Sequence, residues 1–360
     1  MNTEDFWNKI DATHPTRISS ETEHLEYPSI VPVRKGVHRP LWSVMIPTYN
    51  CAKYLERTLK SVLEQAPRTE LMQIEVVDDC STKDDPEAVV RELGRGRVSF
   101  YRQPQNVGAI CNFNTCIQRS VGQIVHILHG DDIVLPGFYN VLQEAFDKEP
   151  TIGAAFCRHI FINEKDHQQF LSALERRTAG VFADLLEPIA VSSIIQAPSV
   201  VVRRSVYEAL GGFHPELFHA GDWDMWKRIA THYPVWYEPQ PLACYRKHSS
   251  SHTSSLSKSG ANIANIRRSI EISQLYLPNT IAGELTIKAR ETLALSAFRS
   301  ACWQLVNFDV IAAIANAREA FKCSRSFKVI RQIVPFLIRA GARRSGRVLL
   351  TALDLSKNNQ

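Results

Sequence analysis

Short apolar runs alternate with helix-length segments between residues 41 and 150. The runs are rich in Val and Ile, which is typical of strands buried on both faces of a parallel sheet. The segments between them carry apolar side chains three and four residues apart, such as Leu55, Leu59 and Val62, so each predicts a helix. The predicted strands are residues 42–46, 74–78, 98–102 and 123–128, and the predicted helices are 52–65, a segment beginning near Pro86, 109–120 and 137–147.

This alternation predicts an α/β fold with a doubly wound, mostly parallel sheet covered by helices on both faces. After residue 150 the pattern loosens and predicts a mixed second half that completes the sheet. The elements expected there are strands at 152–158, 198–204 and 241–248 and a helix at 222–232.

The pattern also divides the chain into three parts. Residues 1–40 are polar with scattered prolines and predict an arm that lies over a domain or stays mobile. Residues 41–255 predict the α/β domain, whose two halves meet near residue 150. Residues 256–360 predict a basic, mainly helical extension.

Composition places the chain among ordinary globular proteins. Its 360 residues are 44% hydrophobic and 22% charged, which suits one large domain with an appendage. The net charge of +5 is modest for this length, so we expect no nucleic-acid partner. The eight cysteines include no Cys-x-x-Cys pair and fall mostly in or beside apolar runs, which favours reduced core thiols.

Two features of the sequence bear on location. No apolar run approaches the length of about 18 residues that a membrane-spanning helix needs. The first residues, MNTEDFWNKID, carry acids and lack the apolar core of a secretory signal. We therefore expect a cytoplasmic protein.

Polar clusters directly follow the four predicted strands of the first half. Because the carboxyl ends of parallel strands meet at one edge of a sheet, we expect these clusters to form one site. The clusters are PTYN (47–50), DDCS (78–81), NVG (106–108) and GDD (130–132).

The adjacent carboxylates Asp131 and Asp132 would repel each other unless a cation lies beside them. Mg²⁺ or Mn²⁺ suits such oxygen ligands and commonly fills the rest of its shell with water and substrate phosphate, so the pair predicts a bound diphosphate. The alternative is that both aspartates cap the helix that begins near Pro136.

Asp78 and Asp79 also follow an apolar strand. A carboxylate there can accept a hydrogen bond from a nucleotide base or a ribose hydroxyl, and helix capping is again the alternative. Asn106 and Gly108 are candidate ligand-binding residues, because glycine allows backbone to approach a ligand closely, although an ordinary turn has the same composition.

Taken together, the motifs resemble the family 2 glycosyltransferases with the GT-A fold. The resemblance covers roughly residues 41–255, about 60% of the chain. The motifs that carry it are PTYN (47–50), VVDDCST (76–82), NVG (106–108), LHGDD (128–132), GGF (211–213), GDWDMWKR (221–228) and YRKH (245–248).

The resemblance implies a GT-A fold and transfer of a sugar from a nucleoside-diphosphate sugar to an acceptor hydroxyl, usually with inversion. Residues 41–150 then bind the nucleotide sugar and residues 151–255 bind the acceptor. The resemblance further implies that Pro47 and Tyr49 flank the nucleotide and that Asp79, with Asp78, contacts the base.

The family's metal- and ribose-binding acidic motif falls on Asp131 and Asp132, with Asp132 the better metal ligand. The family's catalytic base falls on Asp222. This assignment agrees with the chemistry, because an attacking hydroxyl needs a carboxylate on the face opposite the leaving diphosphate. The alternative for Asp222 and Asp224 is a helix start, and we expect Asp224 to pair with Arg228 four residues later.

The chain departs from the family pattern at three places. Gly221 stands where many members have Glu, and His129 stands where many have a third acidic residue. Residues 112–114 are Asn-Phe-Asn where many members have Ala-Arg-Asn, so a phosphate-contacting Arg is missing. Arg246, Lys247 or His248 can replace that Arg, and His248 is also a candidate ligand for the metal, with a structural role as the alternative.

The C-terminal segment is basic. From Phe321 to Leu353 there is no Asp or Glu, and Ile330, Ile333, Val334 and Leu337 have the spacing of one helix face. Such a segment predicts peripheral contact with an anionic membrane at its inner face. The alternative is a helical cap with a solvated basic surface, and Pro335 argues against one unbroken helix.

The leading interpretation is a metal-dependent, inverting glycosyltransferase, hexosyltransferase-like, that acts on a saccharide or lipid-linked acceptor in surface polysaccharide or glycolipid biosynthesis. A sugar nucleotidyltransferase is one rival, although PTYN replaces the Gly-rich basic loop that it needs. A non-catalytic domain that binds nucleotide sugar or membrane is the other rival. A dehydrogenase is disfavoured, since no G-x-G-x-x-G follows a strand.

Overall fold

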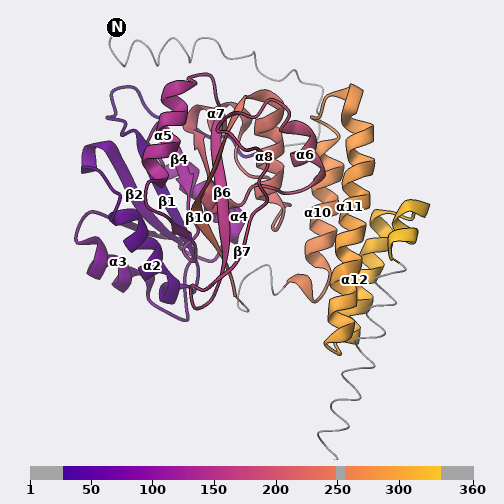
Figure 1. Cartoon of the computed structure of the whole chain (residues 1–360). Coiled ribbons are helices and arrows are strands. Elements are labelled where there is room, and N and C mark those ends of the chain that lie inside the picture. Colours follow the sequence, from indigo (N-terminus) through magenta and orange to yellow (C-terminus); the bar gives the residue numbers. More distant parts are fainter. Residues whose placement is uncertain (1–26, 249–255, 334–360) are drawn as a thin grey trace, which may run out of the picture. The chain divides into compact units, whose positions relative to one another are not determined.

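The computed structural model describes residues 27–248 and 256–333 of the chain (Figure 1). The described residues form two compact units. The first contains the residues up to Ile189 together with Ser193–Lys247, and the second contains Ala190–Ser192 and the residues from His248 onward. The first unit is the α/β domain, and the second is helical.

The first half of the sheet consists of four parallel strands, as predicted. β1 (Trp42–Thr48) lies between β2 (Met72–Asp78) and β4 (Ile124–Ile127), and β3 (Ser99–Arg102) pairs with the outer side of β2. The strand order therefore reverses at β1, and such a reversal leaves a crevice at the carboxyl ends of the neighbouring strands.

Helices pack on both faces of these strands (Figure 1). Apolar side chains of α2 (Ala52–Leu63) and α5 (Phe138–Lys148) join Val44 and Ile46 of β1 in the main hydrophobic cluster. Successive strand residues point to opposite faces, so the buried Met45 faces the other side, where α4 (Ala109–Arg119) contacts β1. α3 (Pro86–Gly94) packs beside α2. The predicted doubly wound α/β arrangement is confirmed.

The second half of the sheet is mixed, as expected. β9 (Val200–Arg203) runs antiparallel to both β4 and β6 (Ala154–Asn163). β10 (Val235–Lys247) runs parallel to β6, and it also pairs antiparallel with the two-residue β5 (Ile133–Val134). Since β5 directly follows Asp132, this pairing brings the acidic pair against β10.

Several elements of the second half are absent from the sequence prediction. They are short or interrupted, so they offer little periodicity to detect. β10 begins six residues before its predicted start, and its register shifts around Pro241, which obscures the strand pattern. The unpredicted elements are β7 (Gln168–Leu171), β8 (Gly180–Val181), α6 (Leu186–Val191) and α7 (Arg204–Leu210).

Residues 27–40 lie over the α/β domain. The carbonyl of Pro28 accepts a hydrogen bond of 2.8 Å from the amide of Gly212, and Arg39 donates to the carbonyls of Val121 and Gly122. Ile30 is only 2% exposed. This part of the arm is therefore packed, while residues 1–26 lie outside the described residues.

The eight cysteines are free thiols, as predicted. Cys116, Cys157, Cys244 and Cys323 are buried, but the prediction that the cysteines are core residues is wrong for Cys111, which is exposed. Cys111 lies on the outward side of α4, whose buried positions are Ile110, Asn112, Cys116 and Ile117.

The second unit consists mainly of α10 (Ala261–Ser273), α11 (Asn279–Val306) and α12 (Val310–Cys323). Alanines fill many of the contacts between these helices, including Ala289 and Ala297 of α11 and Ala312 and Ala320 of α12. Within the described residues, no helix combines the length and the apolar character needed to cross a bilayer. Val334, Leu337 and the basic residues beyond them lie outside the described residues.

Candidate functional site

The loops that follow β1 and β2 are bound to each other. Asn50 has a left-handed backbone with φ 50°, and its side-chain oxygen accepts hydrogen bonds of 2.9 Å from the amides of Thr82 and Lys83. Its own amide donates to the Ser81 hydroxyl, and the amide of Ala52 donates to Asp84 at the start of α2. The PTYN and DDCS motifs thus form one rigid edge.

Asp79 connects this edge to the loop after β3. Its two carboxylate oxygens accept hydrogen bonds from the amides of Val107 and Gly108, at 2.7 and 2.9 Å. Asn106 donates from its side chain to the Asp79 carbonyl. Gly108 has φ 84°, a conformation that favours glycine. Burial raises the pKa of Asp79. This carboxylate therefore shapes the turn formed by 106–108, and its contact with a base stays a prediction.

Asp78 is fully buried and is also bound by protein groups. Its carboxylate accepts hydrogen bonds from the amide and the hydroxyl of Ser81. It also forms an ion pair with Arg102, with Nε of Arg102 2.7 Å from Oδ2 of Asp78. Asp78 and Asp79 hence hold neighbouring loops through different partners, and neither carboxylate acts as a helix cap. The Asp85 carboxylate caps α3 instead.

Pro47 and Tyr49 occupy different positions along this edge. Pro47 is buried in β1, and its carbonyl accepts a hydrogen bond of 3.0 Å from the amide of Gly130. Tyr49 is 47% exposed, so its ring is accessible to a ligand. The hydrogen bond from Gly130 also joins the GDD motif to the PTYN motif, which confirms that the polar clusters meet at one edge of the sheet.

The acidic pair forms a cluster with His129. The ligand atoms of His129, Asp131 and Asp132 all lie within 4.8 Å of one another, the one such group that could hold a metal ion among the described residues. Nδ1 of His129 lies 3.7 Å from Oδ2 of Asp132. Burial and the nearby Asp131 carboxylate raise the pKa of Asp132 well above its ordinary value. The ionised form of Asp132 is therefore unfavourable at this position unless a cation lies beside it.

These residues fit a divalent cation. Asp132 is 1% exposed, and its Oδ2 has no hydrogen-bond partner among the described residues. Nε2 of His129 is likewise buried without a partner there. Burial lowers the pKa of His129, which favours the neutral imidazole that metals bind. Buried polar atoms usually have partners, so an orphaned carboxylate oxygen beside an imidazole indicates a group that binds between them.

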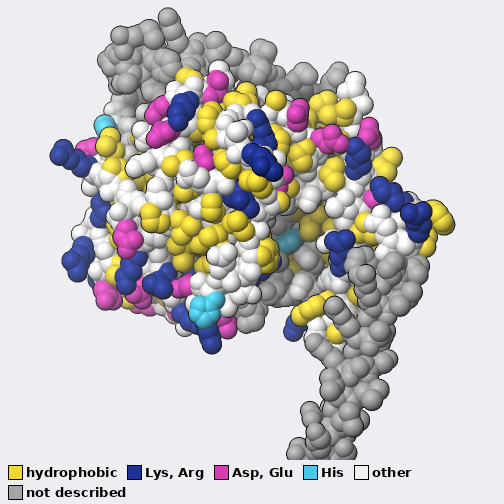
Figure 2. All heavy atoms as spheres, in the orientation of Figure 1, with side chains coloured by type: hydrophobic (Ala, Val, Ile, Leu, Met, Phe, Trp, Pro, Cys, Tyr) yellow, Lys and Arg dark blue, Asp and Glu magenta, His cyan; other side chains and the backbone are white. Residues whose placement is uncertain are grey.

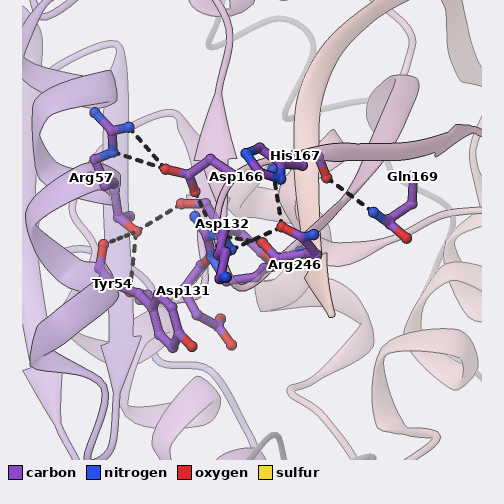
Figure 3. A network of polar contacts seen from close by, with 12 residues as sticks. Tyr54, Arg57, Asp131, Asp132, Asp166, His167, Gln169 and Arg246 are labelled. Atoms are coloured by element: carbon purple, nitrogen blue, oxygen red, sulfur yellow. Dashed lines mark hydrogen bonds and ion pairs between the residues drawn. The ribbon is translucent and has the colours of Figure 1, made fainter. Parts of the chain in front are cut away.

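Arg246 supports the acidic pair from inside the protein (Figure 3). Its amide donates a hydrogen bond of 2.8 Å to Oδ1 of Asp132, and its guanidinium donates one of 2.7 Å to the carbonyl of Asp131. The same guanidinium pairs with Asp166 at 2.5 Å, and Asp166 in turn pairs with Arg57 of α2 at 2.9 Å. Residues of α2, β10 and the loop before β7 are thereby joined around the pair.

The structure corrects one expectation for Arg246. It is 2% exposed and bound to protein carbonyls and Asp166, so it does not replace the missing phosphate-contacting Arg. Lys247 is exposed, and its ammonium lies 4.4 Å from the ring centre of Phe161 and 4.8 Å from that of Phe170. His248 belongs to the second unit, and its role as a metal ligand stays a prediction.

Asp222 lies in the first turn of α8 (Gly221–His232). Its carboxylate accepts a hydrogen bond of 2.7 Å from the amide of Trp223, and burial raises its pKa to about 6. Such a pKa suits a general base near neutral pH. Steric crowding explains why glycine precedes Asp222, since a Cβ at Gly221 would lie 2.6 Å from Cδ1 of Ile110 in α4.

Asp224 has a structural role, as predicted. It is buried and pairs with Arg228 at 3.1 Å. Arg228 also donates to the carbonyls of Leu210 and Gly212, which fixes the GGF motif beside α8. The two aspartates of GDWD therefore differ in environment. Asp224 forms a salt bridge with Arg228, whereas Asp222 forms no salt bridge among the described residues.

The sequence profile of glycosyl transferase family 2 matches residues 43–211. The chain carries a glycosyl transferase family 2 domain. An uncharacterized protein of Mycobacterium tuberculosis is 28% identical over 241 residues, which cover 64% of this chain and 74% of that protein. TuaG of Bacillus subtilis, named for teichuronic acid biosynthesis, is 35% identical over 97 residues, 26% of this chain and 37% of TuaG.

A solved structure extends the likeness to the whole fold. The mannosyltransferase PcManGT of Pyrobaculum calidifontis, solved with GDP-Man and Mn²⁺, superposes with a TM-score of 0.54 and 18% identity. The superposition covers 98% of this chain and 94% of that protein. The superposition thus shows the GT-A fold. The enzyme class, a glycosyltransferase, is shown by the family 2 match over residues 43–211.

Two residues of the family 2 domain become functional candidates only in the structure. His129 joins the acidic cluster, although the sequence shows it only as a missing acid. Phe113, at the position of the missing Arg, stacks on His129 with ring centres 4.9 Å apart. The sequence shows that His129 and Phe113 both depart from the family pattern, and this departure is the signal that could have marked them as candidates. Their contact with each other becomes visible only in the folded structure.

Proposed function

We propose that this glycosyltransferase transfers a sugar from a nucleoside-diphosphate sugar to an acceptor hydroxyl, with inversion and with a divalent metal ion. The observation that carries the proposal is the cluster of His129, Asp131 and Asp132. Within it, the buried Oδ2 of Asp132 has no hydrogen-bond partner among the described residues. The cluster lies at the edge of the sheet where the polar loops after β1, β2 and β3 are bound together.

The donor binds along this edge. Tyr49 offers an exposed ring for the base, and Pro47, Asp78, Asp79, Asn106 and Gly108 form the wall of the nucleotide site. Asp131 binds the ribose or the metal. Phe113 contributes no charge where an Arg would neutralise phosphate, so we assign that neutralisation to the metal ion and to exposed cations such as Lys247.

Asp132, Asp131 and His129 hold the metal ion, with His248 as a further candidate ligand. Carboxylate oxygens suit Mg²⁺ and Mn²⁺ alike, and imidazole favours the softer ion, so we propose Mn²⁺ as the preferred metal. When bound, the ion stabilises the negative charge that develops on the leaving diphosphate.

Asp222 acts as the general base. Its ionised carboxylate accepts the proton of the acceptor hydroxyl while the hydroxyl oxygen bonds to the anomeric carbon of the donor. The bond from that carbon to the diphosphate oxygen breaks, and its electron pair leaves with the nucleoside diphosphate. Attack opposite to the leaving group inverts the anomeric centre. The pKa of about 6 leaves most Asp222 ionised at neutral pH.

The acceptor class is also a proposal. The likeness to TuaG over a quarter of the chain supports a saccharide of the cell envelope. With a lipid-linked acceptor, the enzyme would work in the cytoplasm, peripherally at the inner face of the membrane. Peripheral membrane contact through the basic C-terminal helices suits that acceptor.

A ligand panel tests the donor and the metal together. Melting temperatures are measured with UDP, GDP and dTDP sugars, each with Mn²⁺, Mg²⁺ or a chelator, because a ligand that binds the native state raises the melting temperature. We expect one nucleotide class to stabilise the protein only with metal. Transfer to saccharide and lipid-linked acceptors is then assayed with the wild type and Asp222→Asn.

The same assays separate the rivals. Donor binding without transfer or donor hydrolysis, unchanged by Asp222→Asn, would indicate a non-catalytic domain. Formation of a nucleotide sugar from a sugar phosphate and a nucleoside triphosphate would indicate a nucleotidyltransferase.

A further inference from the structure

The C-terminal helices present an unusual set of outward side chains over residues 307–333. Seven of the exposed residues are large and apolar, five are basic, and no exposed residue in this segment is acidic. Ile311 and Phe327 are 84% and 78% exposed. The apolar members are Phe308, Val310, Ile311, Ile314, Phe321, Phe327 and Ile330, and the basic members are Arg318, Lys322, Arg325, Lys328 and Arg331. We call these twelve residues the outer basic surface.

Helical spacing gathers much of this surface on one side of α12. Ile311, Ile314, Arg318 and Phe321 follow one another at intervals of three, four and three residues, the spacing of a single helix face. Yellow apolar and dark-blue basic side chains lie side by side over the C-terminal helices in Figure 2. The surface is thus a mixed patch rather than separate apolar and charged regions.

One of these apolar side chains also packs within the second unit, since the ring of Phe321 meets the buried Phe298 edge-on with ring centres 5.0 Å apart. The opposite face of α12 is buried through Ala312, Ala313, Ala320 and Cys323, and α12 makes its main contacts with α11. The helix bundle therefore has its own core of small residues. Isolated exposed apolar residues are common on proteins, but a contiguous group of large ones usually marks an interaction site.

The charge of the surface specifies the partner. Lys322 pairs with Glu319 and Lys328 pairs with Glu291, and both glutamate side chains are only 13% exposed, so the outermost charges remain positive. The sequence has no Asp or Glu from residue 334 to Leu353. These twenty residues therefore provide no acidic segment that could cover the surface. A positive surface that also exposes Phe and Ile fits a partner that is anionic at its boundary and apolar beneath.

We propose that the outer basic surface docks on an anionic lipid bilayer. Lys and Arg contact the phosphate headgroups, and Ile311, Ile314, Phe321 and Phe327 enter the boundary between the headgroups and the acyl chains. Long basic side chains can keep their charge in the headgroup layer while their stems lie along apolar surface. This inference deepens the proposed function, because it names the surface that brings the enzyme to a lipid-linked acceptor.

The test is co-sedimentation of the full chain with vesicles, without donor or metal. Vesicles of phosphatidylcholine alone are compared with vesicles in which a third of the lipid is phosphatidylglycerol, at low and high salt. We expect binding only to the anionic vesicles, weakened by salt because exposed charges are screened.

Two double variants probe the two components of the surface. Ile311→Asn with Phe327→Asn removes apolar insertion without changing charge, and Arg318→Gln with Arg325→Gln removes two charges without changing apolar area. We expect each to reduce the partition coefficient about tenfold or more. The control, Arg68→Gln with Arg91→Gln, removes the same charge from exposed sites of the α/β domain and should bind like the wild type.

Equal binding by the wild type and both surface variants, or no binding by the wild type, would overturn the proposal. A concentration-dependent dimer that Ile311→Asn disperses would also overturn it, since the surface would then join two copies of the chain. Because sedimentation needs no donor and the donor panel needs no vesicles, failure of membrane docking is distinguishable from failure of the proposed transfer.

Discussion

The main-chain amide of Arg246 donates a hydrogen bond of 2.8 Å to Oδ1 of Asp132. This contact turns the carboxylate so that Oδ2 faces His129 and has no hydrogen-bond partner among the described residues. β10, which pairs with the short strand β5 that follows Asp132, thereby sets the orientation of the acidic residue that we propose as the main metal ligand. Predictions about the cluster therefore involve β10 as well as the GDD motif.

Asp132→Asn should abolish the rise in melting temperature that Mn²⁺ and the nucleotide sugar give together. The amide keeps the size of the side chain but loses its charge, so affinity for the metal should fall about 100-fold or more. Calorimetric titration with Mn²⁺ measures this directly. Asp147→Asn, an exposed acid on α5, is the matched control and should bind metal like the wild type. Unchanged titration of Asp132→Asn would remove Asp132 from the metal site.

His129→Asp restores the acid that many family members carry, and we expect it to change metal preference. Imidazole favours softer ions than a carboxylate does, so the variant should gain affinity for Mg²⁺ relative to Mn²⁺. The ratio of the two dissociation constants, measured by titration, should shift by about tenfold toward Mg²⁺. A ratio equal to that of the wild type would mean that His129 does not contact the ion.

Local contacts were within reach of the sequence, and distant ones were not. The pair of Asp224 and Arg228 follows from the spacing of one helix turn, and the strands of the first half follow from their apolar composition. The binding of Asp79 to the amides of Val107 and Gly108 joins residues 28 and 29 positions apart, and no periodicity reports such a contact.

The same limit applies to the metal cluster. His129 reads as a lone polar residue near the end of a strand, and its stacking on Phe113 becomes evident only when α4 is packed on the sheet. The resemblance to a family located the acidic pair, but it could not locate substituted partners, because the family pattern records different residue types at both positions.

Arg246→Gln should destabilise the protein and weaken metal binding together. The guanidinium is almost fully buried, and its loss removes contacts to the carbonyls of Asp131 and Asn163 and to Asp166. We expect the free energy of unfolding in urea to fall by about 2–3 kcal/mol, which is less than for a fully buried pair because Asp166 is partly exposed.

Arg57→Gln provides the comparison for Arg246→Gln. Its side chain is 61% exposed and pairs with the same Asp166, so its loss should cost about 0–1 kcal/mol and leave Mn²⁺ affinity unchanged. Equal losses of stability in the two variants would show that Arg246 does not specifically support the acidic pair.

The pH dependence of transfer should report the ionisation of Asp222. Only the ionised carboxylate accepts a proton, so kcat should rise with pH and level off above the pKa of about 6. At pH 5 the rate should be about tenfold below its plateau. Asp222→Asn should lower kcat about 10²- to 10⁴-fold and remove this inflection.

Asp224→Asn is the neighbouring control for Asp222→Asn. It leaves the buried Arg228 without its carboxylate, so it should lower stability by about 3–5 kcal/mol. Per folded molecule, the inflection near pH 6 should remain. If Asp224→Asn removed the inflection and Asp222→Asn kept it, the base would be Asp224.

The absence of Glu before Asp222 has a steric explanation that a double-mutant cycle can test. Any side chain at Gly221 would place Cβ 2.6 Å from Cδ1 of Ile110, so Gly221→Ala should lower the free energy of unfolding by about 1–3 kcal/mol. Ile110→Val deletes that methyl group and should cost about 0.5–1.5 kcal/mol on its own. In the Ile110→Val background, Gly221→Ala should cost little, since the obstructing atom is gone. The two changes should therefore couple by about 1 kcal/mol or more in urea unfolding. Additive losses would mean that Ile110 already moves aside, and that the approach of α4 to α8 does not determine the glycine before the proposed base.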